Sequence, residues 1–378
     1  MDFSFSEQQI MLRTTAKDFL GKEQPKTKTR MLYQDEKGYD QKLWKDMAEL
    51  GWQGLVLPEE FGGVDGGFLD LVILFEEMGR NIVPGPFFPT VALCALPILG
   101  FGTTEQKSRF LPSIATGEAI WSLALIEESA SYNSSAINMT AITKGDHYIL
   151  NGCKIFVPAA HIANYLLVAA RTGKSKDTAS GITLFIMETP KSPGVKIEHV
   201  PTIAGDRKFN VTFDNVEVPK YNVLGSVGEG WKIIDFIMQR AAILKCAEIS
   251  GACQAVLDMT SAYAKDRIQF DRPIAAFQAV QHKLADMVID IDAIQYLLYQ
   301  AAWGISIGEP NQMHISFAKA KAAEAYQKIC IEGITTHGAI GFTMDCDIGL
   351  YYLRVREAEF TGGNTDMHIE KIAAELGL

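Results

Sequence analysis

The pattern of apolar and polar positions divides the chain into three parts. Up to about residue 113, apolar residues recur at helical spacing, and Ser6 followed by Gln9 is typical of a capping box at a helix start. From about residue 120, short segments rich in β-branched and aromatic residues follow one another, and helical spacing returns after Gly230. The order predicts an α+β protein: an N-terminal helical domain, a central β-barrel or sandwich, and a C-terminal four-helix bundle.

The same pattern gives approximate element and domain bounds. Helices are expected near 7–20, 42–50, 68–79, 231–268, 275–307, 311–337 and 364–376. Strands are expected near 120–126, 147–158, 165–171, 182–188, 195–200 and 209–219. Asn151 and Gly152 predict a hairpin turn. The expected domains are 1–118, 119–226 and 227–378.

Composition narrows the class of protein. A chain of 378 residues with 48% apolar residues is long enough for more than one packed unit. Its formal charge of -10 and the lack of a basic cluster argue against nucleic acid or an anionic membrane as the main partner. The six cysteines form no CxxC pair and no metal-ligand spacing, so we expect no metal. Without an apolar run long enough to span a bilayer or a signal-peptide pattern, a soluble cytoplasmic protein without membrane insertion is expected.

The stretch 263–287, YAKDRIQFDRPIAAFQAVQHKLADM, holds the strongest candidate chemistry. Pro273 interrupts the helical pattern and predicts a turn between two helices. Arg267 and Phe270 stand three apart, so on a helix they share a face, and Gln278 follows the turn. A guanidinium, a ring and amides suit a ligand that carries a phosphate and a ring. Taken singly, these residues also fit a helix cap, a core phenylalanine and a solvated amide.

As a unit, this stretch resembles the pattern RxxFGxPIxxFQxVQxxLADM of the acyl-CoA dehydrogenase family, with Asp271 at the usual glycine. The resemblance covers the full length and implies the same α, β, α order. It implies that Arg267 contacts the pyrophosphate of an FAD held mainly by a neighbouring subunit. It also places Phe270 and Gln278 along the ADP portion of that FAD.

A second stretch, THGAIGFTMDCD at 336–347, has glycines that let another segment or a ligand approach the backbone. A helix C-cap and turn explains Gly338 equally well. The stretch resembles the family pattern QxHGGxGFT, which places the backbone at Gly338 against the partner's FAD. Thr335 stands for the usual Gln and Ala339 for one of the glycines.

Two segments of the β region resemble the family's flavin-facing loops. LALIEESASYN at 123–133 corresponds to the TEPGAGSD loop, and Ile126 takes the place of the threonine that bonds the flavin ring. KIFVPAA at 154–160 resembles KxWITN, with Phe156 for the tryptophan that covers the flavin. The resemblance therefore implies flavin contact through Ile126 and Phe156, with fewer side-chain hydroxyls.

The catalytic base is the largest departure from the family. Oxidation of an acyl-CoA needs a carboxylate to remove the α-proton. The family's YEGT motif corresponds here to residues 362–365, which puts Gly363 at the base and Thr365 at the cofactor-contacting threonine. The other family location, early in the bundle's first helix, is Ala241. No catalytic residue is therefore assigned, although Glu248, Glu357 and Glu359 are nearby in sequence.

The segment 76–90 resembles the family's lining of the acyl chain. Pro86, Phe87 and Thr90 then stand at the pocket bottom, where rings and prolines would shorten or reshape a straight slot. A core role for Phe87 is equally consistent with the sequence.

The resemblance leaves three functions open. The first is an FAD-dependent acyl-CoA dehydrogenase with a base at an unusual position, acting on a cyclic or branched acyl-CoA and passing electrons to electron-transfer flavoprotein. The second is a non-catalytic, cofactor-sharing subunit of a heteromeric acyl-CoA dehydrogenase. The third is a flavin oxidase or monooxygenase on the same fold. A homotetramer or a heterotetramer with a second subunit of the family is expected.

Overall fold

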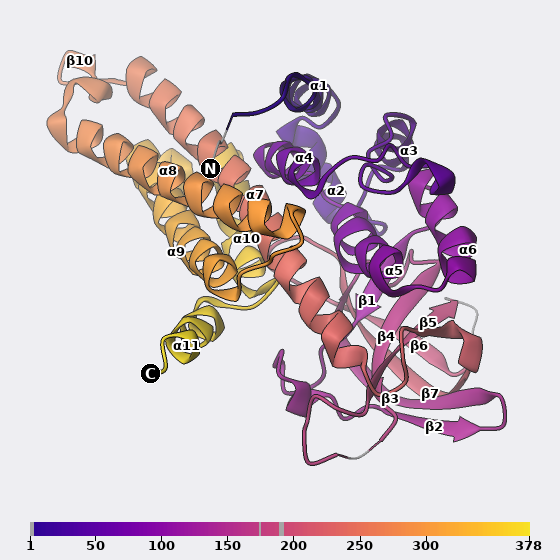
Figure 1. Ribbon diagram of the computed structural model, residues 1–378. Helices are drawn as coiled ribbons and strands as arrows, with labels where there is room; N and C mark the ends of the chain where they lie inside the picture. The colour runs from indigo at the N-terminus through magenta and orange to yellow at the C-terminus, as the bar shows by residue number, and fades with distance from the viewer. Residues whose placement is uncertain (1–3, 174, 189–192) are drawn as a thin grey trace. The chain divides into compact units, whose positions relative to one another are not determined.

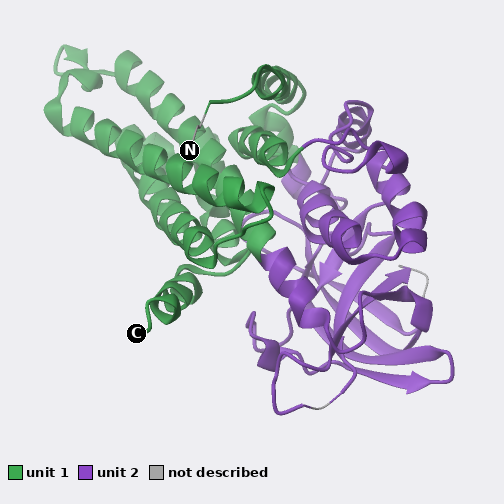
Figure 2. Ribbon diagram, viewed as in Figure 1, with its two compact units in different colours: residues 1–31, 67–83, 239–378 green, residues 32–66, 84–238 purple. Residues whose placement is uncertain are grey.

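The computed structural model describes residues 4–173, 175–188 and 193–378. The chain forms two compact units (Figure 2). Unit 1 comprises residues 1–31, 67–83 and 239–378, and unit 2 comprises residues 32–66 and 84–238. The boundary falls within α2 (Lys26–Gln34) and α7 (Gly230–Asp266). The division separates the N-terminal helices from one another, and the domain bounds expected from sequence stay a prediction.

Unit 1 is built from helices. Besides its parts of α2 and α7, it contains α1 (Glu7–Glu23), α4 (Phe68–Asn81), α8 (Gln278–Ser306), α9 (Gln312–His337), α10 (Asp347–Phe360) and α11 (Thr365–Glu375) (Figure 1). The predicted capping box is confirmed, because Ser6 and the Gln9 side chain each bond the other's backbone amide. Asn311 and Asn364 cap α9 and α11 in the same way, each accepting from an amide three residues on.

Two glycines let α4 and α7 pack with direct backbone contact. A Cβ on Gly79 would lie 2.0 Å from the Glu248 carbonyl oxygen, and one on Gly251 would lie 1.8 Å from that of Glu76. Only glycine permits this approach. On the α7 side of the contact, residues 241–247 are all buried. Helix α7 therefore packs directly on α4 through a buried segment.

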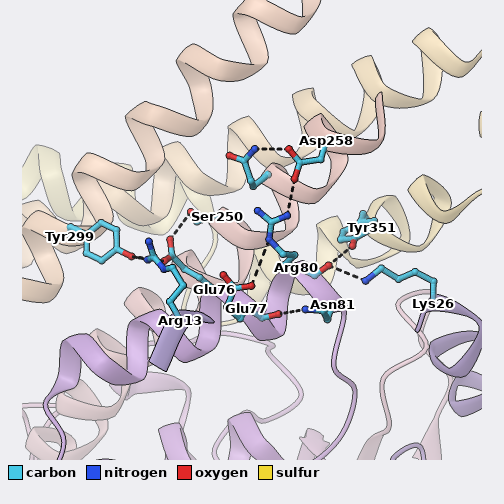
Figure 3. Close-up of polar contacts among 11 residues, drawn as sticks. Arg13, Lys26, Glu76, Glu77, Arg80, Asn81, Ser250, Asp258, Tyr299 and Tyr351 are labelled. Atoms are coloured by element: carbon cyan, nitrogen blue, oxygen red, sulfur yellow. Dashed lines mark hydrogen bonds and ion pairs between the residues drawn. The ribbon is translucent and has the colours of Figure 1, made fainter. Parts of the chain in front are cut away.

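A buried carboxylate links four helices of unit 1 (Figure 3). Glu76 on α4 accepts from Arg13 of α1 at 2.6 Å, from Ser250 of α7 at 3.0 Å, and from the Tyr299 hydroxyl of α8. Burial raises the pKa of Glu76, while these donors hold the charged form. Both carboxylate oxygens are engaged, so Glu76 ties helices together.

Unit 2 combines short helices with a β-sheet. Its helices are α3 (Gln41–Glu49), α5 (Leu96–Phe101), α6 (Thr104–Ala115) and a π-helical segment (Phe88–Ala95). The strands are β1 (Trp121–Ala124), β2 (Thr140–Lys144), β3 (His147–Pro158), β4 (Tyr165–Arg171), β5 (Ile182–Glu188), β6 (Val195–Val200), β7 (Lys208–Pro219) and β8 (Val223–Leu224). Trp121 stacks on Tyr165 at 4.5 Å, and Phe110 meets Trp121 edge-on at 5.2 Å in the core.

The sheet has the order β6-β7-β3-β2-β4-β5-β8, with β1 paired to β4. The predicted hairpin turn at Asn151 and Gly152 is wrong. These residues lie inside β3, at a register shift against β7 where Gly152 has φ 147°. The turn comes earlier, where Lys144 pairs with His147. Asn-Gly here supplies the conformation that a bulge needs.

The α+β fold predicted from sequence is confirmed: helices precede a central sheet, and a helical bundle follows it. In the part of the chain that the structure describes, no helix has both the length and the apolar character that crossing a membrane requires.

Candidate cofactor and catalytic site

The strongest sequence motif forms a β-hairpin between α7 and α8. Strand β9 (Ile268–Gln269) pairs with β10 (Arg272–Pro273), and the Ile274 amide donates to the Arg267 carbonyl at 2.8 Å. The predicted break and turn between two helices are present, but the turn is the tip of a short hairpin that was not predicted. The predicted shared helical face of Arg267 and Phe270 is wrong, because α7 ends at Asp266. Pro273 occupies a position of the ladder that needs no amide donor, so the hairpin tolerates it.

The hairpin tip holds two non-glycine residues at positive φ. Phe270 has φ 52° and Asp271 has φ 60°, the conformation of a type I′ turn. The Phe270 ring is 86% exposed and meets Phe277 edge-on at 6.0 Å. Gln278, the third residue predicted for this site, starts α8 directly after Phe277. An exposed ring on a strained turn is typical of a binding surface.

Gly338 lies at the same end of unit 1 as the hairpin. It follows the last residue of α9, has φ 67°, and an added Cβ would meet nothing within 4 Å. Its neighbour His337 stacks on Tyr263 of α7 at 4.2 Å, four residues before Arg267. The two sequence motifs are therefore brought together. Thr335, in place of the family's Gln, accepts from Lys283 at 3.3 Å.

The segment 360–364, called here the base turn, lies between α10 and α11. Lys319 of α9 is fully buried, and its ammonium donates to the carbonyls of Ala358, Glu359 and Gly363 at 2.7–3.0 Å. Burial lowers the pKa of Lys319 to about 8. Lys319 was not predicted from the sequence, although a lysine on the apolar face of a helix was visible there. Thr365, the predicted cofactor contact, begins α11 directly after the turn.

His368 holds the base turn from its other side. Its Nε2 donates to the Gly362 carbonyl at 3.0 Å, so Nδ1 is the acceptor for the Ser316 hydroxyl at 3.1 Å. Burial lowers the pKa of His368 to about 3, so the ring stays neutral.

A side chain in the base turn would be strained and would meet close neighbours. Gly363 has φ 101°, and a Cβ there would lie 1.8 Å from Met367 Cε. A Cβ on Gly362 would lie 2.9 Å from the Ala242 Cα. Ala241, the alternative base position, is buried beside this contact. The two empty base positions are thus neighbours and tightly packed.

The three nearby glutamates are engaged in ion pairs. Glu248 bonds Lys245, and Glu357 lies 3.5 Å from Lys245 while accepting from the Thr361 hydroxyl at 2.8 Å. Glu359 pairs with Arg356 at 2.5 Å. Glu248 and Glu357 line a cavity of about 20 Å³, room for roughly one water and too small for an acyl chain.

In unit 2, the two predicted flavin-facing residues lie on adjacent segments. The Ile155 amide donates to the Ile126 carbonyl at 2.8 Å. Phe156, next along β3, has φ 53° at a register shift and is 41% exposed. Lys154, which the sequence analysis did not single out, donates to Glu127 at 2.7 Å and to the Leu125 carbonyl at 3.0 Å. Burial lowers the pKa of Lys154 to about 8.

The predicted acyl-pocket residues have structural contacts in unit 2. The Thr90 hydroxyl bonds the Trp121 backbone amide and carbonyl at 3.1 and 3.2 Å. Phe87 is buried and meets Trp44 edge-on at 6.4 Å, and Pro86 is buried beside it. Their part in a substrate pocket stays a prediction.

Within unit 1, the candidate residues form two separate groups. The hairpin and Gly338 lie at the C-terminal end of α9, whereas the base turn is held by Lys319 near its N-terminal end. Gly338 follows Lys319 by 19 positions, which correspond to about 28 Å of helix. The candidate residues of unit 1 therefore lie toward two different ends of α9.

Comparison with known proteins places the chain. It matches the acyl-CoA dehydrogenase N-terminal domain over residues 6–118, the middle domain over 122–216 and the C-terminal domain over 228–377. The caffeyl-CoA reductase-Etf complex subunit CarC of Acetobacterium woodii is 32% identical over 355 residues, 92% of each chain.

Two solved structures have the same fold. The butyryl-CoA dehydrogenase of Megasphaera elsdenii has a TM-score of 0.93 at 29% identity over 100% of both chains. A chain of the ChsE4-ChsE5 complex from Mycobacterium tuberculosis has a TM-score of 0.90 at 26% identity, over 100% of this chain and 99% of that one. The chain therefore belongs to the acyl-CoA dehydrogenase family, FAD-dependent oxidoreductases that act on CH-CH groups.

Proposed function

We propose that this chain is the cofactor-sharing subunit of a heteromeric acyl-CoA dehydrogenase, in which a second chain of the same fold supplies the catalytic glutamate. The substrate is an acyl-CoA thioester, and the electrons leave through electron-transfer flavoprotein. The assembly is a heterotetramer.

The packing of the base turn carries this proposal. Removal of an α-proton needs a carboxylate placed against the substrate. A side chain at Gly363 would be strained by the φ of 101° and would have to displace the methyl group of Met367. Glu248 and Glu357 are held by Lys245, and Glu359 by Arg356. A carboxylate from another chain meets the requirement without disturbing these contacts.

The residues present fit an FAD. When bound, FAD supplies the hydride acceptor for the oxidation. An exposed arginine, Arg267, and the exposed Phe270 ring suit its pyrophosphate and adenine ends, with Gln278 beside them. Gly338 leaves space for close approach, and Thr365 of unit 1 is assigned a flavin contact. Ile126 and Phe156 of unit 2 are each assigned a flavin contact as well.

Sharing of the cofactor between chains follows from the two separate ends of unit 1. The hairpin and Thr365 lie at opposite ends of α9, so in this proposal they serve two different FAD molecules. The ChsE4-ChsE5 complex and the Etf complex subunit provide precedents within the family for a two-chain assembly and for an Etf partner.

The runner-up is a homotetrameric dehydrogenase with a relocated base, acting on a cyclic or branched acyl-CoA. It requires one of the engaged glutamates to leave its ion pair on substrate binding. An oxidase or monooxygenase on this fold has no specific structural observation in its favour.

The test compares the chain expressed alone with the chain co-expressed with a family member from the same genome that has Glu before Gly-Thr. The flavin-to-chain ratio is measured, followed by anaerobic titration with straight, branched and cyclic acyl-CoAs. We expect no bleaching of the flavin by any acyl-CoA for the chain alone, and bleaching for the complex. Replacing the partner's glutamate with Gln should abolish bleaching in the complex.

Bleaching of the chain alone by one acyl-CoA would overturn the proposal and favour a relocated base. Peroxide release in air without an external acceptor would favour oxidase chemistry instead.

A further inference from the structure

The hairpin between α7 and α8 has a second arginine beside Arg267. Of these two arginines, only Arg267 has a cofactor role by the family resemblance. Arg272 lies on the opposite strand, and its guanidinium carbon lies 4.1 Å from the centre of the Phe277 ring. This stack fixes the direction of the guanidinium before any ligand binds.

The register of the hairpin puts both arginines on one face. Arg272 is paired with Gln269, and the ladder continues with the bond from the Ile274 amide to the Arg267 carbonyl. Residues directly opposite each other project to the same side, as do residues two apart on one strand. Arg267 and Arg272 are therefore diagonal neighbours on the same face of the hairpin, roughly 7–8 Å apart at the backbone.

Among the residues that the structure describes, neither guanidinium has a carboxylate or carbonyl acceptor. Lysines of the same unit behave differently, since Lys283 pairs with Glu332 at 2.6 Å and Lys321 with Asp290 at 2.7 Å. Two like charges held close together on a short hairpin repel each other unless an anion lies between them. The arrangement is typical of a site that awaits a multivalent anion.

We propose that Arg272 is a second pyrophosphate-binding residue, so that Arg267 and Arg272 together clamp the diphosphate of a flavin dinucleotide. Two guanidiniums match the two charges of a diphosphate, and each offers paired N–H donors to phosphate oxygens. The N-terminus of α8, a helix of 29 residues, begins at Gln278 and adds a favourable dipole. This inference goes beyond the proposed function, because it holds whichever chain supplies the catalytic base.

The strained tip supports the clamp. Phe270 adopts φ 52°, which is unfavourable for a bulky residue, and exposes its ring on the turn that joins the two arginine-bearing strands. Strain of this kind persists where the geometry serves a ligand. The competing role for Arg272 is structural: it covers Phe277 and stabilises the hairpin without touching a ligand.

The test measures flavin affinity in the assembled protein after removal of its flavin. FAD and FMN are titrated by flavin fluorescence into the parent, Arg272→Gln, Arg272→Lys and Lys265→Gln. Lys265 is an exposed cation near the end of α7, outside the hairpin, and serves as the matched control. FMN carries a single phosphate and no diphosphate, so it reports on the flavin end alone.

For Arg272→Gln we expect FAD affinity to fall about tenfold or more, the usual effect of losing a charge-assisted contact. FMN affinity should change less than about threefold. Arg272→Lys should lose part of the FAD affinity, because a point charge replaces a bidentate donor. The dependence of FAD affinity on salt should also become shallower in Arg272→Gln.

Three results would overturn the clamp: an equal loss of FMN affinity, a loss no larger than that of Lys265→Gln, or full retention of FAD affinity by Arg272→Gln. The melting temperature of the flavin-free variants distinguishes a structural role of Arg272 from a role in binding the diphosphate. If Arg272→Gln lowers it and FAD affinity falls only in proportion, Arg272 stabilises the hairpin and does not bind the diphosphate.

Discussion

Two turns of unit 1 place two consecutive residues at positive φ, and they differ in almost every other respect. The base turn uses Gly362 and Gly363, is buried, and is held by Lys319 and His368. The hairpin turn has the non-glycine residues Phe270 and Asp271, is exposed, and so presents an aromatic ring and a carboxylate at its tip. The base turn has glycines, which carry no side chain, at its two strained positions. The hairpin turn has residues with side chains at the equivalent positions despite the strain.

The difference bears on function. Positive φ costs a non-glycine residue of the order of 1–2 kcal/mol, so the hairpin tip keeps Phe270 and Asp271 at some expense in stability. The base turn avoids this penalty because it has glycines at both positions, and for the same reason it has no carboxylate. In our proposal, the end of the chain that binds the cofactor keeps its residues, while the end that would remove the proton lacks a carboxylate. A subunit that shares a cofactor but relies on another chain for the base has this combination.

The largest expected effect comes from restoring a glutamate to the base turn. Gly363→Glu forces a side chain onto φ 101° and against Met367 Cε. Strain and overpacking together should lower the free energy of unfolding by about 3 kcal/mol, measured by urea denaturation. The variant expressed alone should also fail to bleach with acyl-CoA.

Gly349→Ala is the matched control for this substitution. A Cβ at Gly349 lies 3.6 Å from the nearest atom, at an ordinary helical φ in α10, so stability should hold or rise slightly. If Gly363→Glu is as stable as the parent, the base turn accommodates a glutamate without cost, and its packing does not explain the missing carboxylate.

The sequence predicted one of these turns better than the other. The absence of a base at positions 362 and 363 was visible in the sequence, and the structure adds the positive φ angles and the close neighbours that a side chain would meet there. The hairpin was predicted as a break between helices, because Pro273 was read as a helix breaker. Its tip residues, Phe and Asp, lack the glycine that usually indicates a type I′ turn, so local sequence rules could not identify it.

Buried polar contacts were the other features that the sequence could not give. Lys319 and His368 reach the base turn from different helices, and only the tertiary structure brings them together. Arg272 was unremarkable in the sequence, since its stack on Phe277 and its shared face with Arg267 depend on the hairpin register. The fold itself was predictable, because periodicity and motif order agree along the whole chain.

A smaller effect concerns the pH dependence of the base turn. Burial lowers the pKa of His368 from 6.5 to about 3 in the folded chain. Between these values the unfolded chain takes up a proton that the folded chain does not, so stability falls as pH falls from about 6.5 towards 3. Between pH 6.5 and 5, His368 should lower the free energy of unfolding by roughly 1–2 kcal/mol, at up to about 1.4 kcal/mol per pH unit.

His368→Gln tests this contribution, because an amide donates to Gly362 and accepts from Ser316 without titrating. Its free energy of unfolding, measured at pH 7.5, 6.0 and 5.0, should fall less steeply with acid than that of the parent. His282→Gln replaces an exposed histidine on α8 and should follow the parent. If the free energy of unfolding falls equally with pH in all three proteins, His368 does not contribute to the pH dependence of stability.

The smallest effect is expected at the hairpin tip, where Asp271 stands at positive φ in the place of the family's glycine. Asp271→Gly should raise the free energy of unfolding of the flavin-free protein by about 0.5 kcal/mol, since glycine adopts this conformation without steric penalty. Asp271→Asn removes the same charge but keeps a side chain, so its stability should stay near that of the parent. Both variants remove the negative charge that directly precedes Arg272 in the chain, and FAD affinity should rise about twofold in each. If Asn stabilises as much as Gly, charge rather than backbone strain governs the hairpin tip, and its contrast with the base turn loses its physical basis.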